Sequence, residues 1–111
     1  MALYLLALGR RPGFRPAGWE ATVQHLMKHP ITILRALALE NLPQPIRESL
    51  QQSLLPRITD RSAPVQIAAL NLAGQSKLLL YLYAVRLAKT KASDMWTSYA
   101  AYTALGLLQG N

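Results

Sequence analysis

The amino-acid sequence predicts an all-α fold of five to six short helices, packed as a helical bundle in a single domain that spans residues 1–111. Three observations predict it. Proline stands at expected helix starts and glycine at expected helix ends, the usual asymmetry of helical chains. No segment alternates apolar and polar residues as a half-buried strand does. Hydrophobic residues make up 51% of the chain, which is enough to build a packed core.

The helices are expected between proline, glycine and serine residues that end one helix and begin the next. Gly9 closes the first apolar stretch, and two prolines and two glycines mark residues 10–18 as a loop. Pro30 and Pro56 stop the helices before them, and Ser62 is the expected N-cap of another. The expected helical segments are Ala2–Leu8, Trp19–Lys28, Ile31–Leu42, Ile46–Leu55, Ser62–Ala73, Lys77–Thr90 and Asp94–Leu108.

The segment Lys77–Thr90 is apolar almost all the way round a helix. Only Arg86 and Lys89, about 60° apart on the helix surface, form a narrow polar edge. A helix of this kind is typical of the centre of a bundle. We therefore expect Lys77–Thr90 to be central, with Tyr81 and Tyr83 mainly in the core and their hydroxyl groups hydrogen-bonded.

Three helical segments recur at a spacing of 32 residues, namely 35–42, 67–74 and 99–106. The stretch LLPRITDRSAPVQIAALNLAG, residues 54–74, resembles a HEAT-type repeat, whose second helix carries small residues that allow close packing. This resemblance implies helix pairs stacked as an α-solenoid. An irregular helical bundle is the alternative interpretation.

The charges are unevenly distributed along the chain. It has 12 basic and 5 acidic residues, and no acid lies in residues 1–19 or 61–93. A small domain with this imbalance repels itself unless an anion is nearby, which indicates a nucleic acid or an acidic surface as partner; a merely solubilising surface is the alternative. The expected phosphate-binding residues are Arg10, Arg11 and Arg15 on a loop and Arg86, Lys89 and Lys91 at a helix end.

The sequence offers no motif for catalysis. It has no cysteine, no nucleophile motif and no phosphate-binding loop. His25 and His29 have the spacing of paired metal ligands, but no third ligand accompanies them, so we interpret them as surface or capping residues. We expect no enzyme activity, no metal and no cofactor. No apolar run approaches about 20 residues, and the basic residues do not flank one strongly amphipathic helix, so we expect no membrane partner. The absence of cysteine fits a reducing compartment, and we expect a cytoplasmic location.

A short, cysteine-free, basic, all-α chain of this kind resembles the small subunit of a CRISPR effector complex (Cascade). Leu78–Lys89, LLLYLYAVRLAK, is similar to the apolar central helix of such subunits. The resemblance implies a non-catalytic subunit of an antiviral ribonucleoprotein that holds RNA or DNA by its backbone. It also implies a larger complex or several copies of the chain. The apolar segment Met1–Leu8 would then pack against a neighbouring subunit. The HEAT-like pattern implies instead a protein–protein adaptor or scaffold that binds an acidic partner.

Overall fold

The computed structural model describes residues 18–110, and these contain six α-helices, two short 3₁₀ helices and no strand. The predicted all-α fold is therefore confirmed, whereas the expected helix Ala2–Leu8 lies outside the described residues. The elements in chain order are α2 (Trp19–Met27), α3 (Thr32–Glu40), α4 (Glu48–Leu54), η1 (Leu55–Thr59), α5 (Ala63–Ser76), η2 (Leu79–Tyr81), α6 (Leu82–Lys91) and α7 (Met95–Leu108).

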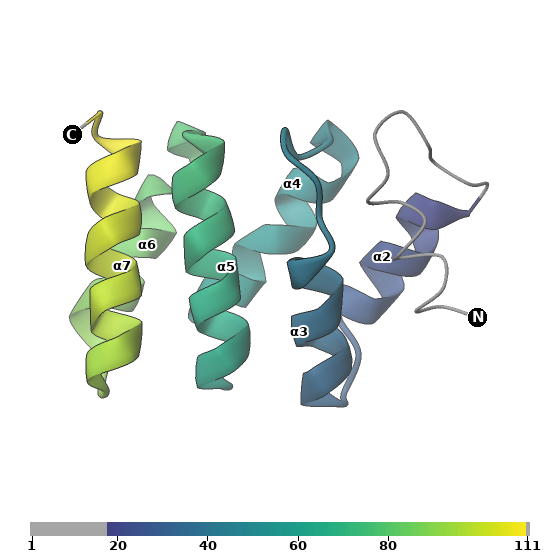
Figure 1. The fold of residues 1–111 in the computed structure, drawn as a ribbon, viewed down its shortest axis with the longest axis horizontal. Helices are drawn as coiled ribbons and strands as arrows, with labels where there is room; N and C mark the ends of the chain where they lie inside the picture. Colours follow the sequence, from purple (N-terminus) through teal and green to yellow (C-terminus); the bar gives the residue numbers. More distant parts are fainter. Residues whose placement is uncertain (1–17, 111) are drawn as a thin grey trace.

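The helices form three consecutive pairs in two layers (Figure 1). α3, α5 and α7 lie side by side in the front layer and run in the same direction, and α2, α4 and α6 lie behind them. α5 packs against α3 on one side and α7 on the other. The turns within the pairs, residues 28–31, 60–62 and 92–94, lie along one edge, here called the turn edge. The segments between pairs, residues 41–47 and 77–78, lie along the opposite edge, here called the linker edge.

The front helices begin at nearly regular intervals. Their N-cap residues are Ile31, Ser62 and Asp94, so the interval is 31 residues from α3 to α5 and 32 residues from α5 to α7. The 32-residue spacing seen in the sequence thus holds for the second interval and is one residue too long for the first. In this register one alanine recurs at a fully buried position of each front helix. These alanines are Ala38, Ala69 and Ala101.

The third pair does not have the expected central helix. The segment from Lys77 divides into η2 and α6, and α6 lies in the rear layer of the last pair. Leu79, Leu80 and Tyr83 are 69%, 38% and 78% exposed, so the prediction of a central Lys77–Thr90 helix is wrong. A helix in a two-layer array packs on one side only, and its other apolar residues remain at the surface. The buried residues of this segment are Tyr81, Val85 and Ala88.

Tyr81 is the one tyrosine of the segment that fulfils the expectation of a core position. Its side chain is fully buried, and its hydroxyl donates a hydrogen bond to the carbonyl oxygen of Gln51 at 2.8 Å. Burial raises the pKa of Tyr81 to about 12, because the charged phenolate would be poorly solvated there. The hydrogen bond satisfies the hydroxyl and ties the third helix pair to α4 of the second.

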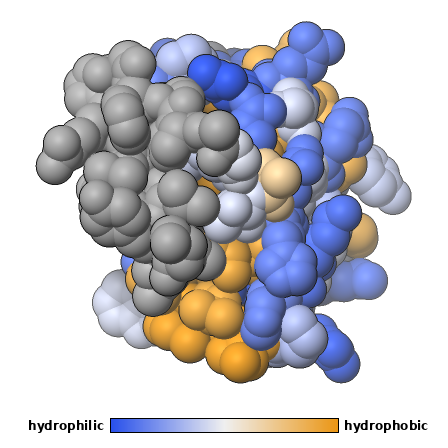
Figure 2. Space-filling view, turned by 90° about the vertical axis from the view of Figure 1, so that its right-hand side faces the viewer, coloured by the Kyte–Doolittle hydropathy of each residue, from blue (hydrophilic) through white to orange (hydrophobic). Residues whose placement is uncertain are grey.

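The end of the array formed by α2 and α3 is seen in Figure 2. Hydrophobic surface gathers in the lower part of this view, and hydrophilic surface covers its right-hand side. Ile31 and Ile33 are large apolar residues exposed around the start of α3. The first pair is thus both polar and apolar at its outer surface.

α5 and α7 approach each other closely at Gly74. A Cβ atom on this glycine would lie 2.8 Å from the Cα of Ala104 and 3.2 Å from the Cδ1 of Leu107. Gly106 occupies the matching position on α7, 32 residues later, and a Cβ atom there would have no neighbour within 4 Å. The same residue type therefore serves close packing at one position and faces open space at the other.

We expect Gly74→Ala to destabilise the protein by about 1–3 kcal/mol, because the backbone of α7 must shift to admit the new methyl group. Gly106→Ala is the matched control, and it should stabilise the protein by up to about 1 kcal/mol through the higher helix propensity of alanine. Urea unfolding at low micromolar protein measures both. Equal effects of the two substitutions would contradict the packing described for Gly74.

Candidate nucleic-acid interface

The predicted phosphate-binding residues fall into two groups. Arg10, Arg11 and Arg15 lie outside the described residues. Arg86, Lys89 and Lys91 are exposed on α6, and within residues 18–110 no ion pair joins them to an acid. Arg86 and Lys89 share one side of the helix, whereas Lys91 projects about 140–160° away from them. The structure therefore brings together two of these three cations.

Lys89 has an aromatic neighbour in addition to its charge. Its Nζ atom lies 5.4 Å from the ring centroid of Tyr102 on α7, within the range of a cation–π interaction. Tyr102 is itself 66% exposed, so the pair lies at the surface where α6 meets α7. A cation beside an exposed aromatic ring can contact both a phosphate and a nucleobase of a single strand.

A second basic cluster lies at the turn edge between the first and second helix pairs, and the sequence analysis did not select it. It surrounds a hollow of about 420 Å³. Four Lys or Arg residues line this hollow together with one aspartate, so positive charge is in excess. The charged residues of this cluster, here called the basic hollow, are Lys28, Arg35, Arg57, Arg61 and Asp60.

Asp60 is the buried centre of the basic hollow, and its side chain is 3% exposed. Its Oδ2 accepts hydrogen bonds from Arg35 Nε at 3.0 Å and Arg57 Nη1 at 2.8 Å. Its Oδ1 accepts from Arg35 Nη2 at 3.0 Å and the backbone N–H of Ser62 at 2.9 Å. Burial alone raises the pKa of Asp60, but the hydrogen bonds from Arg35 and Ser62 and the charges of the two arginines outweigh it and hold the pKa below 3.8.

Arg35 also fixes the neighbouring turn. Its Nη1 donates to the carbonyl oxygens of His29 at 2.8 Å and Pro30 at 3.1 Å. The Nδ1 of His29 accepts a hydrogen bond from the N–H of Ile31 at 3.1 Å, so this histidine helps to form the turn before α3. Among the described residues, no group of three or more His, Cys, Asp or Glu residues is placed to hold a metal ion.

The acids of the turn edge are engaged by local donors. Asp60 is bound as described above, and Asp94 caps α7 by accepting from the N–H of Thr97 at 2.8 Å and its Oγ1 at 2.7 Å. The hydrogen bonds that Asp94 accepts from Thr97 lower the pKa of its carboxyl group. Lys28, Arg61 and Lys91, by contrast, are exposed cations in or beside the three turns. The turn edge therefore presents positive charge to solvent.

The linker edge has the opposite balance. Glu40 ends α3, Glu48 begins α4, and the Glu20 carboxylate accepts hydrogen bonds from Arg47 and from Ser49 Oγ. These hydrogen bonds, from Ser49 first and then Arg47, lower the pKa of Glu20. Lys77 is the other cation of this edge. The charges of the described chain are thus segregated, with the surplus of cations at the turn edge.

The repeat contains a signal for one of the missed cations, Arg57. Lys28 follows α2, Arg57 lies in η1, and Lys89 and Lys91 end α6, so each rear segment of a pair carries a cation close to its C-terminal end. Arg57 and Lys89 are 32 residues apart and correspond in the repeat. A search for basic residues in repeat register would have selected them together.

Comparison with protein-family models, curated proteins and solved structures found no match to this chain. Within residues 18–110, no helix is both long enough and apolar enough to cross a lipid bilayer.

Asp60→Asn should lower the free energy of unfolding by about 3–5 kcal/mol, because it leaves the partly buried Arg35 and Arg57 without their counter-charge. Glu20→Gln is the matched control, and it removes the exposed ion pair with Arg47. It should cost less than about 1 kcal/mol. Urea unfolding at neutral pH compares the two variants, and a loss at Asp60 no larger than that at Glu20 would refute a central role for Asp60.

The contribution of Asp60 should depend on pH in acid. Because its pKa is lowered in the folded protein, its contribution to stability is complete above the ordinary value of 3.8 and is lost as pH falls through the lower folded-state value. The difference in unfolding free energy between the unaltered protein and Asp60→Asn should therefore be constant at neutral pH and shrink below that value. A difference that stays constant to pH 2 would contradict the lowered pKa.

Proposed function

We propose that this protein is a non-catalytic structural subunit that binds nucleic acid along its turn edge, through backbone phosphates and independently of base sequence. The observation that carries the proposal is the segregation of charge. At the turn edge Asp60 is buried and Asp94 caps a helix, while Lys28, Arg61 and Lys91 stay exposed and unpaired within residues 18–110. A surface of this kind attracts a polyanion over a longer range than a mixed surface does.

The geometry of the turn edge suits an extended anion. The three turns follow one another along the array, and front helices packed about 8–10 Å apart give a row roughly 20 Å long. One strand of B-DNA advances about 3.4 Å per phosphate, so such a row corresponds to about six nucleotides. The basic hollow lies in this row, and the exposed guanidinium of Arg61, which no acid engages among the described residues, has the planar shape that binds phosphate through two hydrogen bonds.

Contacts to phosphates alone would make binding insensitive to base sequence. This agrees with the resemblance to the Cascade small subunit, which implies a role in holding a guide–target duplex or a displaced strand within a ribonucleoprotein. Lys89 and Tyr102 add an aromatic ring that would favour single strands, since stacking needs an unpaired base. Comparison of single-stranded and double-stranded probes therefore distinguishes these two targets.

A protein–protein adaptor is the second candidate function, and the front layer favours it. A hollow of about 360 Å³ lies between α5 and α7, and Ile67, Trp96 and Tyr99 are among the residues that line it. Trp96 is 70% exposed, and exposed tryptophan is typical of binding hot spots. Parallel helices with grooves between them are the surface that helical-repeat scaffolds use for their partners. On this alternative, Trp96→Ala would abolish partner binding and leave nucleic-acid binding unchanged.

The main proposal is tested by the triple variant Lys28→Gln, Arg61→Gln, Lys91→Gln. Fluorescence anisotropy with unrelated single-stranded and double-stranded probes, over a series of salt concentrations, measures affinity and its salt dependence. We expect the variant to weaken binding equally for all probe sequences. Its log–log salt slope should fall by roughly 2–3, because each lost phosphate contact contributes about 0.7–0.9.

The double variant Arg86→Gln, Lys89→Gln tests the cluster on α6 in the same assay, with an expected fall of roughly 1.5–2 in the slope if both residues bind phosphate. Lys77→Gln removes an exposed cation of the linker edge and should leave the slope nearly unchanged. Equal losses from Lys77→Gln and from the turn-edge substitutions would mean that net charge alone drives binding. Failure of the unaltered protein to bind any probe would favour the adaptor function.

A further inference from the structure

α7 carries a stripe of four residues centred on the side opposite Ala104, which packs on Gly74 of α5, and one of the four, Tyr99, also borders the hollow between α5 and α7. The four residues follow a spacing of 4, 3 and 4 residues, which places them within about 60° of one another on the helix surface. This is the spacing of the seam through which one helix packs on another. The four residues, here called the outer seam, are Met95, Tyr99, Tyr102 and Gly106.

The outer seam repeats a seam that is already used inside the protein. The residues that lie 32 positions earlier on α5 include Ile67, Leu70 and Gly74. Leu70 is fully buried, and at Gly74 the backbone of α7 lies within contact distance of α5. In α7 the corresponding residues are uncovered, because Met95, Tyr99 and Tyr102 are 72%, 67% and 66% exposed. The last helix therefore presents a packing face of the kind that its neighbour buries.

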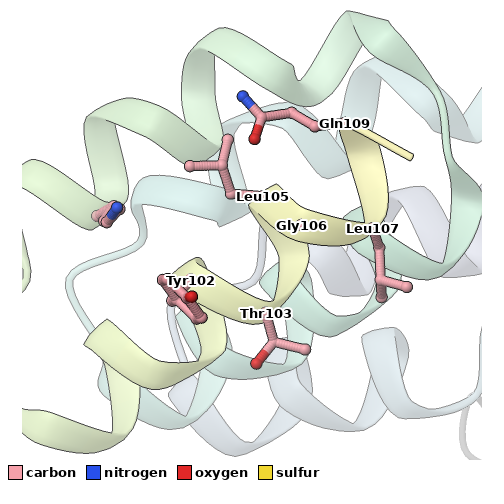
Figure 3. A pocket seen from close by; sticks show the side chains of 7 residues that line it. Tyr102, Thr103, Leu105, Gly106, Leu107 and Gln109 are labelled. Carbon is pink, nitrogen blue, oxygen red and sulfur yellow. The ribbon is translucent and has the colours of Figure 1, made fainter. Parts of the chain in front are cut away.

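The close-up view shows the space over this face. A hollow of about 470 Å³ lies against α7, with Tyr102 at one end, Gln109 at the other and Gly106 between them (Figure 3). Gly106 has no neighbour that a Cβ atom would meet, so a second helix can approach its backbone as α7 approaches Gly74. Leu105 lies beside the hollow and extends its apolar lining.

We propose that the outer seam binds the outer seam of a second copy of this chain, with the two α7 helices antiparallel. The spacing of 4, 3 and 4 reads the same in both directions, so an antiparallel copy matches it residue by residue. Met95 then faces the partner's Gly106, and Tyr99 faces the partner's Tyr102. A large side chain meets the open glycine at both ends, and two aromatic pairs lie in the middle.

The charges fit this arrangement. α7 itself contains no charged residue between Met95 and Leu108, and the charged residue that lines the hollow over the seam is Lys89 of α6, whose Nζ lies 5.4 Å from the ring centroid of Tyr102. The antiparallel orientation places the two positive turn edges on opposite sides of the dimer, whereas a parallel pair would place them side by side. Since the chain has a net charge of +7, the antiparallel arrangement has the lower electrostatic cost.

The size of the seam sets the expected affinity. Large side chains of this type bury roughly 150–250 Å² each when fully covered, so three that are about two-thirds exposed offer roughly 300–500 Å² per copy. An interface of this size belongs to weak, reversible pairs. We therefore expect a dimer that forms at high micromolar concentration. Because its two-fold symmetry uses the same face of both copies, association stops at the dimer.

Sedimentation velocity without nucleic acid, from about 5 to 500 μM protein, tests the proposal. The average mass should rise from the monomer value of 12.3 kDa toward twice that value. Tyr99→Glu should remain monomeric over the whole series. Tyr83→Glu is the matched control, because it places the same acid at an exposed tyrosine of α6, and it should dimerise as the unaltered protein does.

Disulfide trapping tests the orientation, since the natural chain has no cysteine. Met95→Cys and Gly106→Cys are made separately, and we expect a mixture of the two to form a mixed disulfide dimer much faster than either variant forms a dimer with itself. Self-linking faster than mixed linking would show a parallel pair, and equal rates would show that the two helices have no fixed register; either result overturns the proposed arrangement. A monomer at every concentration, or a dimer that persists in Tyr99→Glu, would overturn the proposal and leave the face to a different partner.

Discussion

The buried carboxylate of Asp60 is the interaction on which the arrangement of the helix pairs depends. It binds Arg35 of the first pair and Arg57 of the second, and both of its oxygens are occupied. An arginine in this position would be costly to bury without its counter-charge, so the network holds together as a unit. It also sets the turn 28–31 beside the turn 60–62. The exposed cations Lys28 and Arg61 border one hollow for this reason, although 33 positions separate them in the chain.

Small residues determine how closely the front helices stack. Ala38, Ala69 and Ala101 are fully buried at matching positions, and Gly74 lets the backbone of α7 come within contact distance. Because the front helices run parallel and are similar in sequence, the face that one helix buries against the next recurs on the last helix. The exposed aromatic residues of α7 are therefore a consequence of regular stacking, in which each helix has a face for a neighbour and Gly106 lies on such a face without one among the described residues.

The positions of the helices were largely predictable, because proline and serine act locally on the backbone. Pro30, Pro56 and Ser62 mark boundaries within a few residues of those observed. Which side of each helix is buried, and how fully, was not predictable from these local signals. The segment of α6 is apolar almost all the way round, apart from the edge formed by Arg86 and Lys89, yet Tyr83 is exposed, since a two-layer array leaves one side of every helix open. Of the basic hollow, the repeat register indicates Arg57 alone, because the pairing of Arg35 with Asp60 joins residues 25 positions apart and no local pattern reports it.

The stacking of helix pairs also determines which part of the protein unfolds locally at the lowest free energy. α5 packs on both α3 and α7, so it is held from two sides, whereas α7 packs on α5 and α6 at one end of the described array. In a structure of this kind stability is approximately a sum over neighbouring units, and the end unit opens at lower free energy than the middle one. Amide hydrogens of α7 would then exchange with solvent sooner than those of α5. Any ligand that spans the three turns would link units that otherwise fluctuate separately and would slow this local opening.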